Sequence, residues 1–439
     1  MDISASGYKD FLWAVEVQRF IMELIGLWPK TDKFTKSNLL RKLHAGIVLI
    51  LFIFVSNIPA IYACIQVWGN MVRLISNLQT TIPLLMITAK YVIMLYKQTV
   101  FLSIVNMMEE DWIAFKLDAE RAVMIRRAHT ARFIMKFGHA FMAVSILIDI
   151  IPIYFGIQIS NLTNFTNRKP LPLMTYHFYD TNKSLQFELA LFFQILTLLV
   201  GGYTQISVDV SLVLIILHIC GQLENFRYQL IRLVSCKDFN ITLNDIIARH
   251  LRLIRFANNI ENTYSLMLLM MVLHFGIIFC LSGFLCVIML TDREIDGTKA
   301  AVCYSILVIL VFLVNTFLYC GAGDLMMEQI FKKGEMNKDI VMEICFVIYI
   351  LISLLMNTFV YCGAGEMVVE QSNAVYRAIC DLEWYKLESQ KARNLILLMI
   401  RTNHPFHITA GKIIPLTIAT FCSILKTSCG YISFLLAKR

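Results

Sequence analysis

The chain has 439 residues, of which 58% are hydrophobic and only 16% are charged, and its formal net charge is +8. A soluble domain carries about a quarter charged residues, so this composition excludes an ordinary soluble protein. Several runs reach the length of about 20 apolar residues that a helix needs to cross a membrane. We therefore expect an all-α polytopic membrane protein. The twelve cysteines lie mostly in apolar runs, where thiols act as small hydrophobic groups.

The predicted elements begin with a basic, amphipathic segment over residues 1–44 that shows no cleavable signal peptide. A transmembrane region follows over 45–372, then a cytoplasmic coupling region over 373–412 and a final span within 413–439. Between spans, residues 98–133 and 221–262 carry apolar side chains at helical spacing among charges, which predicts cytoplasmic helices that extend the spans. The individual spans are predicted at residues 45–65, 74–96, 134–155, 189–212, 264–290, 301–322, 343–364 and 413–436.

Three glycosylation acceptors lie between the third and fourth spans, at Asn161, Asn164 and Asn182. Such sites are modified only on the lumenal, later external, side, so this loop is predicted outside and the N-terminus in the cytoplasm. Basic residues agree with this orientation, because the segments assigned to the cytoplasm hold 26 Lys and Arg, whereas the external loops hold 6. This orientation argues against a G-protein-coupled receptor, whose N-terminus is outside.

One stretch occurs twice. NTFLYCGAGDLMMEQ at residues 315–329 returns as NTFVYCGAGEMVVEQ at 357–371, with ten of fifteen positions identical. Each copy ends an apolar run, and seven spans keep the basic residues of 373–412 in the cytoplasm whereas eight do not. Either one copy does not span, or the end of the chain is inverted, or two alternative exons are read together. We favour the exon origin over a transporter-like repeat, because no other part of the chain repeats.

Four stretches carry the most recognisable motifs: GLWP at 26–29, YCGAGE at 361–366, EQSNAVYRAICDLEWY at 370–385 and the segment 395–436. Together they resemble insect odorant receptors over nearly the full chain. The resemblance implies the seven-transmembrane-helix fold with a cytoplasmic N-terminus. It also implies an odorant-binding subunit of a ligand-gated, non-selective cation channel. Such a subunit lies in the plasma membrane of olfactory sensory neurons and assembles with the co-receptor Orco as a heterotetramer.

The resemblance is to a tuning subunit, because Orco carries a long insertion between the fourth and fifth spans and 221–262 is short. A related gustatory-like channel is an alternative, although its last-span signature of the form TYxxxxxQF is absent. A non-functional splice or gene-model variant is another, because the family has one YCGAG-type motif and this chain has two. The second copy runs directly into 370–385 and is the better candidate for the sixth span.

Odorants are small, volatile and mostly apolar, so their site should be a buried apolar pocket with a few polar groups. By resemblance, the pocket lies among the outer halves of the second, third, fourth and sixth spans. Any one residue there could be ordinary core packing, but as a set they predict a cavity that selects by shape. These residues are Thr81, Met86, Ser145, Ile148, Tyr154, Phe192, Phe193, Leu196, Phe346 and Tyr349.

The resemblance also implies that the last span lines the pore, with one such helix from each subunit. Near its outer end, one helical face carries Tyr431, Phe434, Leu435 and Lys438. An apolar ring there can gate by dewetting. The competing explanation is a packed helix end with a snorkelling lysine, since a lysine in a cation path is unfavourable.

Charges inside spans are costly and indicate function by default. Lys90 and Asp209 both fall in inner halves and could pair, unless each reaches the cytoplasmic interface separately. Asp149 could favour an amine-bearing ligand, although exposure at the interface is the more ordinary explanation. His139 and His274 are predicted to be core residues and not metal ligands.

By resemblance, residues 221–262 and 373–411, the latter with Trp384 and Tyr385, form an intracellular anchor where subunits meet. A solvated amphipathic helix is the alternative. We find no phosphate-binding loop, HExxH motif or paired CxxC, so no enzyme activity, cofactor or metal is expected. Odorant, Orco and membrane lipids are the expected partners, without nucleic acid. A metabotropic receptor and a secondary transporter are the competing classes.

Overall fold

The computed structural model describes residues 3–29, 35–114, 117–154, 171, 173, 184–233, 239–291 and 338–437. In these residues nearly all of the chain is helical. The elements are α1 (Ile3–Leu24), α2 (Thr35–Ile50), the π-helix η1 (Leu51–Asn57), α3 (Ile58–Gln66), α4 (Met71–Tyr96), α5 (Gln98–Ile113), α6 (Asp118–Tyr154), α7 (Ser184–Leu233), α8 (Phe239–Thr291), α11 (Lys338–Cys380), the 3-10 turn η3 (Trp384–Lys386), α12 (Ser389–Thr402), β1 (Thr409–Ala410), β2 (Ile414–Pro415) and α13 (Ile418–Ala437).

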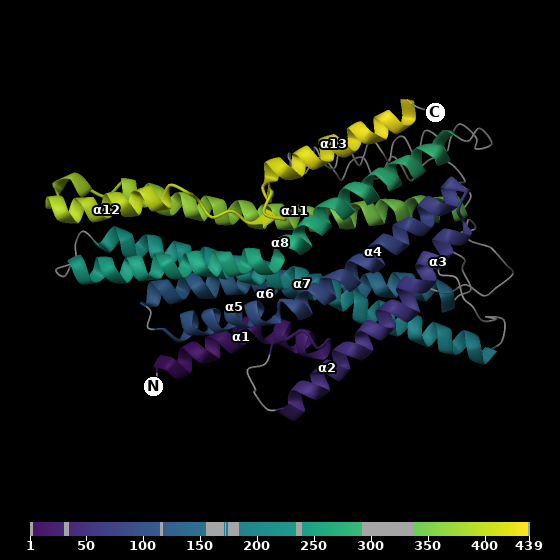
Figure 1. The fold of residues 1–439 in the computed structure, drawn as a ribbon, viewed down its shortest axis with the longest axis horizontal. Coiled ribbons are helices and arrows are strands. Elements are labelled where there is room, and N and C mark those ends of the chain that lie inside the picture. Colours follow the sequence, from purple (N-terminus) through teal and green to yellow (C-terminus); the bar gives the residue numbers. More distant parts are fainter. Residues whose placement is uncertain are drawn as a thin grey trace.

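The helices form an elongated bundle whose two ends differ (Figure 1). At one end α12 folds back along the end of α11, beside the adjoining ends of α7 and α8. At the other end α3 and α4 diverge from the bundle, and α13 runs out from a base beside the middle of α11.

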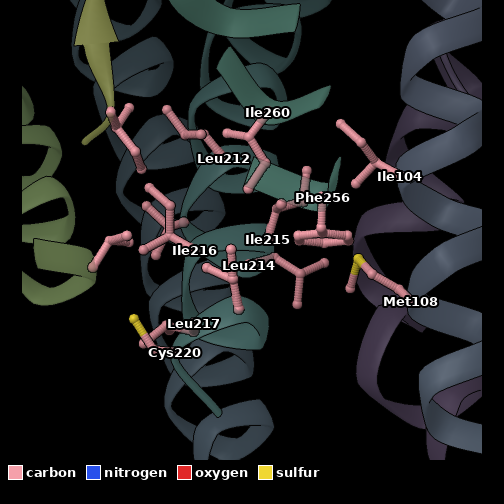
Figure 2. Packing of buried hydrophobic residues seen from close by; sticks show 14 of the residues in the cluster. Ile104, Met108, Leu212, Leu214, Ile215, Ile216, Leu217, Cys220, Phe256 and Ile260 are labelled. Atoms are coloured by element: carbon pink, nitrogen blue, oxygen red, sulfur yellow. The ribbon is translucent and has the colours of Figure 1, made fainter. Parts of the chain in front are cut away.

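Helix α7 is the centre of the bundle, since it packs against α6, α11, α8 and α4. Its residues from Ser207 to Gly221 are buried without exception. A helix that is apolar on all sides is expected to be buried on all sides. Figure 2 shows this packing, with Leu212 and Ile215 facing the α8 side chains of Phe256 and Ile260.

The GLWP motif ends the N-terminal helix α1 and docks the chain. Gly26 has a positive φ of 76°, and the Leu27 N–H donates to the Met22 carbonyl at 2.8 Å, which is the bond of a Schellman helix stop. The following Trp28 is buried edge-on against Phe101 of α5, with ring centroids 6.2 Å apart. The motif thus turns the chain and anchors it.

The end of the bundle that holds the adjoining ends of α7 and α8 is held by ion pairs between helices. Glu224 of α7 accepts from Arg126 at 2.5 Å and from Arg127 at 2.8 Å, both on α6. The two guanidinium groups outweigh the burial of Glu224 and hold the pKa of its carboxyl below its usual value. Asp111 of α5 likewise accepts from Arg252 of α8 at 2.9 Å.

The predicted spans in the described residues mostly coincide with helices. The segments predicted to extend the spans are also helical, as α5 with the start of α6 and as the adjoining ends of α7 and α8. The last helix differs from the prediction, because it begins at Ile418 and not at 413. The preceding residues form the β1–β2 hairpin, in which Gly411 and Lys412 have positive φ angles of 65° and 61°. The first copy of the repeat lies outside the described residues.

Candidate functional site

Four stretches with described side chains are long and apolar enough to cross a membrane: Lys42–Gln66, Arg73–Tyr96, Leu185–Leu233 and Phe239–Ser282. Aromatic residues mark both ends of the second one. Trp68 before α4 is 81% exposed and Tyr96 at its end is 82% exposed, as expected for side chains at the two membrane–water interfaces. Depth can therefore be counted along α4 at about 1.5 Å per residue.

The helices of the predicted pocket surround α7, which contacts α4, α6 and α11 directly. Small residues allow the closest approach. A Cβ added at Gly202 of α7 would lie 2.9 Å from Ile146 of α6, and one at Gly138 of α6 would lie 3.2 Å from Ile206 of α7. Small residues at contacts between membrane helices are the sequence signal for this packing.

The side chains of the predicted pocket residues are exposed to different extents. Thr81 and Ser145 are buried, whereas Phe192 is 60% and Phe193 is 42% exposed on this chain. Met86 and Leu196 are half-buried. The Ser145 hydroxyl donates to the Phe141 carbonyl of its own helix at 2.9 Å, so its oxygen lone pairs are still free to accept. The side chains of Ile148, Tyr154, Phe346 and Tyr349 lie outside the described part of the chain, as does that of Asp149.

Polar residues that the sequence reading missed join the same helices. Gln79 of α4 donates to the Ser282 hydroxyl of α8 at 2.8 Å, and both side chains are buried. Asn57 of η1 donates to the Thr88 hydroxyl of α4 at 2.8 Å. Polar side chains within apolar runs were the available signal, because inside a membrane they must find partners on other helices.

Lys90 and Asp209 form a buried ion pair, which confirms the predicted pairing. The Lys90 ammonium of α4 donates to Asp209 Oδ1 of α7 at 2.5 Å, and the two side chains are 3% and 7% exposed. The other oxygen, Oδ2, accepts from Gln205 at 3.1 Å and from Asn357 of α11 at 3.3 Å. Three helices thus meet at a single carboxylate.

The second copy of the repeat connects α11 to the base of α13. A Cβ added at Gly365 would lie 2.2 Å from the Leu416 carbonyl oxygen, so only glycine fits there without a shift. The Glu366 carboxylate accepts from the Ile418 N–H at 3.2 Å, where a negative charge is favourable because the N-terminus of a helix is positive. The motif YCGAGE therefore seats the last helix.

The predicted pore residues lie toward the far end of α13. Tyr431 is 59% exposed. Phe434 and Leu435 belong to the helix, but their side chains lie outside the described residues, as do Lys438 and the predicted glycosylation sites Asn161, Asn164 and Asn182. In the described residues no group of three potential metal-ligating side chains occurs. His139 is buried beside Tyr203, with ring centroids 6.0 Å apart.

The sequence matches the family model described as 7tm odorant receptor over residues 70–332 and 335–429, and the break falls between the two copies of the repeat. A comparison with curated proteins finds no match. The insect olfactory receptor OR5 from Machilis hrabei has the same fold, with a TM-score of 0.73 at 12% identity over 97% of this chain and 98% of that one. Its structure in complex with eugenol gives 0.71 at 13% identity over the same shares.

The family match covers most of the chain, and the structural similarity supports the fold independently of sequence identity. The predicted family and the predicted all-α fold are both confirmed. Members of this family are multi-pass membrane receptors and not enzymes. The chain belongs to the insect odorant receptor family.

Proposed function

We propose that the chain is the odorant-binding, tuning subunit of a ligand-gated, non-selective cation channel formed with the co-receptor Orco. It acts in the plasma membrane of olfactory sensory neurons with its N-terminus in the cytoplasm. Membership of the odorant receptor family is the observation that carries this proposal. The three parts of a channel subunit, a ligand site, a pore helix and an assembly surface, each have support in the chain.

The ligand site is the region between α4, α6, α7 and α11. This region has aromatic rings and few polar groups, which suits a small, mostly apolar molecule. The similar receptor OR5 has been solved with eugenol, which has the size and polarity expected here. The buried hydroxyls of Thr81 and Ser145 are the groups able to orient such a ligand, and Phe193 supplies apolar surface.

The pore helix is α13. It leaves the bundle from a base seated on α11 and extends beside the outer part of α8 (Figure 1). Its Tyr431 is 59% exposed on the single chain, which leaves this face available to line a shared axis. An apolar constriction of Tyr431, Phe434 and Leu435 would close by dewetting. Lys438 then requires either that Orco subunits dominate permeation or that its side chain points away from the cation path.

The assembly surface lies at the cytoplasmic end. Helix α12 buries Leu395 and Leu398 against the bundle but leaves Leu397 and Ile400 59% and 62% exposed. Ile413 in the hairpin is 78% exposed. Exposed apolar patches outside a membrane indicate protein contacts. We assign this patch to the interface with neighbouring subunits, including Orco.

The test is expression in oocytes of this chain with Orco, of Orco alone and of this chain alone, each exposed to a panel of volatile alcohols, esters and phenols that includes eugenol. We expect an odorant-evoked inward current with both subunits and a different response profile with Orco alone. Odorant responses without Orco, or none with both subunits at the cell surface, would overturn the proposal. Glycan mapping at Asn161 tests the orientation.

A further inference from the structure

The carboxylate of Asp209 lies outside both the predicted pocket and the pore face. Lys90 precedes Tyr96 by six residues, so the ion pair lies about 9 Å from the cytoplasmic interface, inside the hydrocarbon region. Charged pairs are rare at such depth and indicate a functional role. The cluster formed by Lys90, Gln205, Asp209, Asn357 and Tyr361 is called the Asp209 cluster below.

The bonds within the Asp209 cluster differ in strength. The Lys90–Asp209 pair is short, at 2.5 Å, and almost fully buried, and removing one partner would leave an uncompensated charge in a low-dielectric medium. The Asn357 bond has an uncharged donor and is long, at 3.3 Å. The buried Tyr361 hydroxyl, one turn further along α11, also hydrogen-bonds the Asp209 carboxylate. When both α11 donors leave, Asp209 keeps Lys90 and Gln205. Helix α11 can therefore part from α7 without exposing a charge.

Helix α11 also contacts the base of the last helix, α13. Asn357 and Gly365 are eight residues apart on α11, which is about two helical turns, or 12 Å. Gly365 touches the backbone at Leu416, and Glu366 binds the first turn of α13. Because these contacts allow little slip, a displacement of α11 at Asn357 is transmitted to the base of α13.

We propose that the hydrogen bond from Asn357 to Asp209 is a latch that holds α11 against α7 in the resting receptor, and that opening the channel breaks it. This inference rests on the proposed channel function. Odorant binding between α4, α7 and α11 favours the parted arrangement, and the Lys90–Asp209 pair stays intact as the fixed half of the latch. Asn357 is thus a positioning residue for gating and makes no contact with the odorant.

The test is Asn357→Leu, which removes the donor and keeps a side chain of similar size. It is co-expressed with Orco and compared with the wild-type chain at equal surface abundance. We expect more unstimulated current and half-maximal activation at about threefold lower odorant concentration, the change that loss of a typical intramembrane hydrogen bond would produce. An unchanged midpoint, or a shift to higher concentration, overturns the latch.

The repeat offers a matched control in Asn315, the position of the first copy that corresponds to Asn357. Asn315→Leu should leave the activation midpoint unchanged. A shift with Asn315→Leu and none with Asn357→Leu would overturn the assignment of the latch to the second copy. If Asn357→Leu does not reach the surface, Asn357→Ala removes the same donor without a branched side chain and carries the same expectation. Absence of current from the wild-type pair would instead count against the channel function itself.

Discussion

At the end of the bundle that holds the adjoining ends of α7 and α8, Glu224 binds two arginines and Asp111 binds Arg252 and His218, and Arg126 beside Glu224 is 63% exposed to solvent. In the membrane half, the described ion pair Lys90–Asp209 has one base, one acid and almost no exposure. If Glu224 or Asp111 loses one of its two partners, the other partner remains and water can take the vacant place. The Lys90–Asp209 pair cannot recover in this way, because water is excluded and the groups left beside Asp209, such as Gln205 and Asn357, carry no compensating charge.

The ion pairs near solvent can only add to the stability of the bundle, whereas the buried pair determines which helices pack together. Exposed pairs contribute little, since solvent screens them and long side chains lose entropy when they are fixed. A buried pair is often no more stabilising than two apolar residues of the same size, yet it fixes which helices face each other. The predictions below test this contrast, beginning with the largest effect.

Replacing either member of the buried pair alone should be the most damaging change. Lys90→Met or Asp209→Leu leaves one buried charge, at a cost of about 3–5 kcal/mol, so surface abundance should fall sharply. The double variant Lys90→Met/Asp209→Leu should recover most of it, because neither charge remains. Surface labelling of tagged receptor measures this. Wild-type abundance in either single variant would show that the pair is not buried in the folded receptor.

The next effect concerns the seat of α13. In Gly365→Ala, the added methyl group would lie 2.2 Å from a backbone oxygen, and such overpacking costs about 1–3 kcal/mol. The matched control is Gly363→Ala, where no atom lies within 4 Å, and alanine there should be neutral or slightly stabilising. Thermal unfolding of both purified variants in detergent gives the comparison. Equal loss in both would contradict the close contact with Leu416.

Helix positions and the Lys90–Asp209 pair could be predicted from the sequence, because apolar run length and charges within spans are strong signals. The face of α7 that borders the predicted pocket could not be predicted in this way. That helix is apolar on all sides, so periodicity gives no direction, and the adjacent Phe192 and Phe193 are 60% and 42% exposed. The β1–β2 hairpin was missed because Lys412 adopts a positive φ of 61°, which is uncommon for a residue with a side chain of this kind.

A smaller effect should appear on acidification, at His250 near the start of α8. Its ring lies between Phe226 and Phe406, with centroids 5.6 and 6.2 Å away. Burial, together with nearby Arg401, lowers the pKa of His250 from 6.5 to about 4. The folded state therefore binds fewer protons than the unfolded state, and stability falls as pH drops from 6.5 toward 4, by about 1 kcal/mol at pH 5.5.

The measurement for His250 is the thermal midpoint at pH 7.5 and 5.5 for the wild-type chain and for His250→Phe. Phenylalanine keeps the ring stack and cannot titrate, so the acid-induced shift should be smaller in the variant by the contribution of His250. Identical shifts in the two proteins would mean that His250 reaches solvent, and that this part of the bundle is less closed than its packing indicates.

The smallest effect belongs to the exposed pair of Arg377 and Glu370 near the end of α11. The two side chains are 60% and 61% exposed at a separation of 2.5 Å, and such pairs contribute about 0–1 kcal/mol. Glu370→Gln should leave surface abundance and thermal midpoint close to wild type, with any residual effect lost at high salt. The exposure refers to a single chain, so a neighbouring subunit could cover this pair in the assembled channel. A loss that is large with Orco and absent without it would then identify Glu370 as part of the subunit interface, where a pair freed from solvent behaves like Lys90–Asp209.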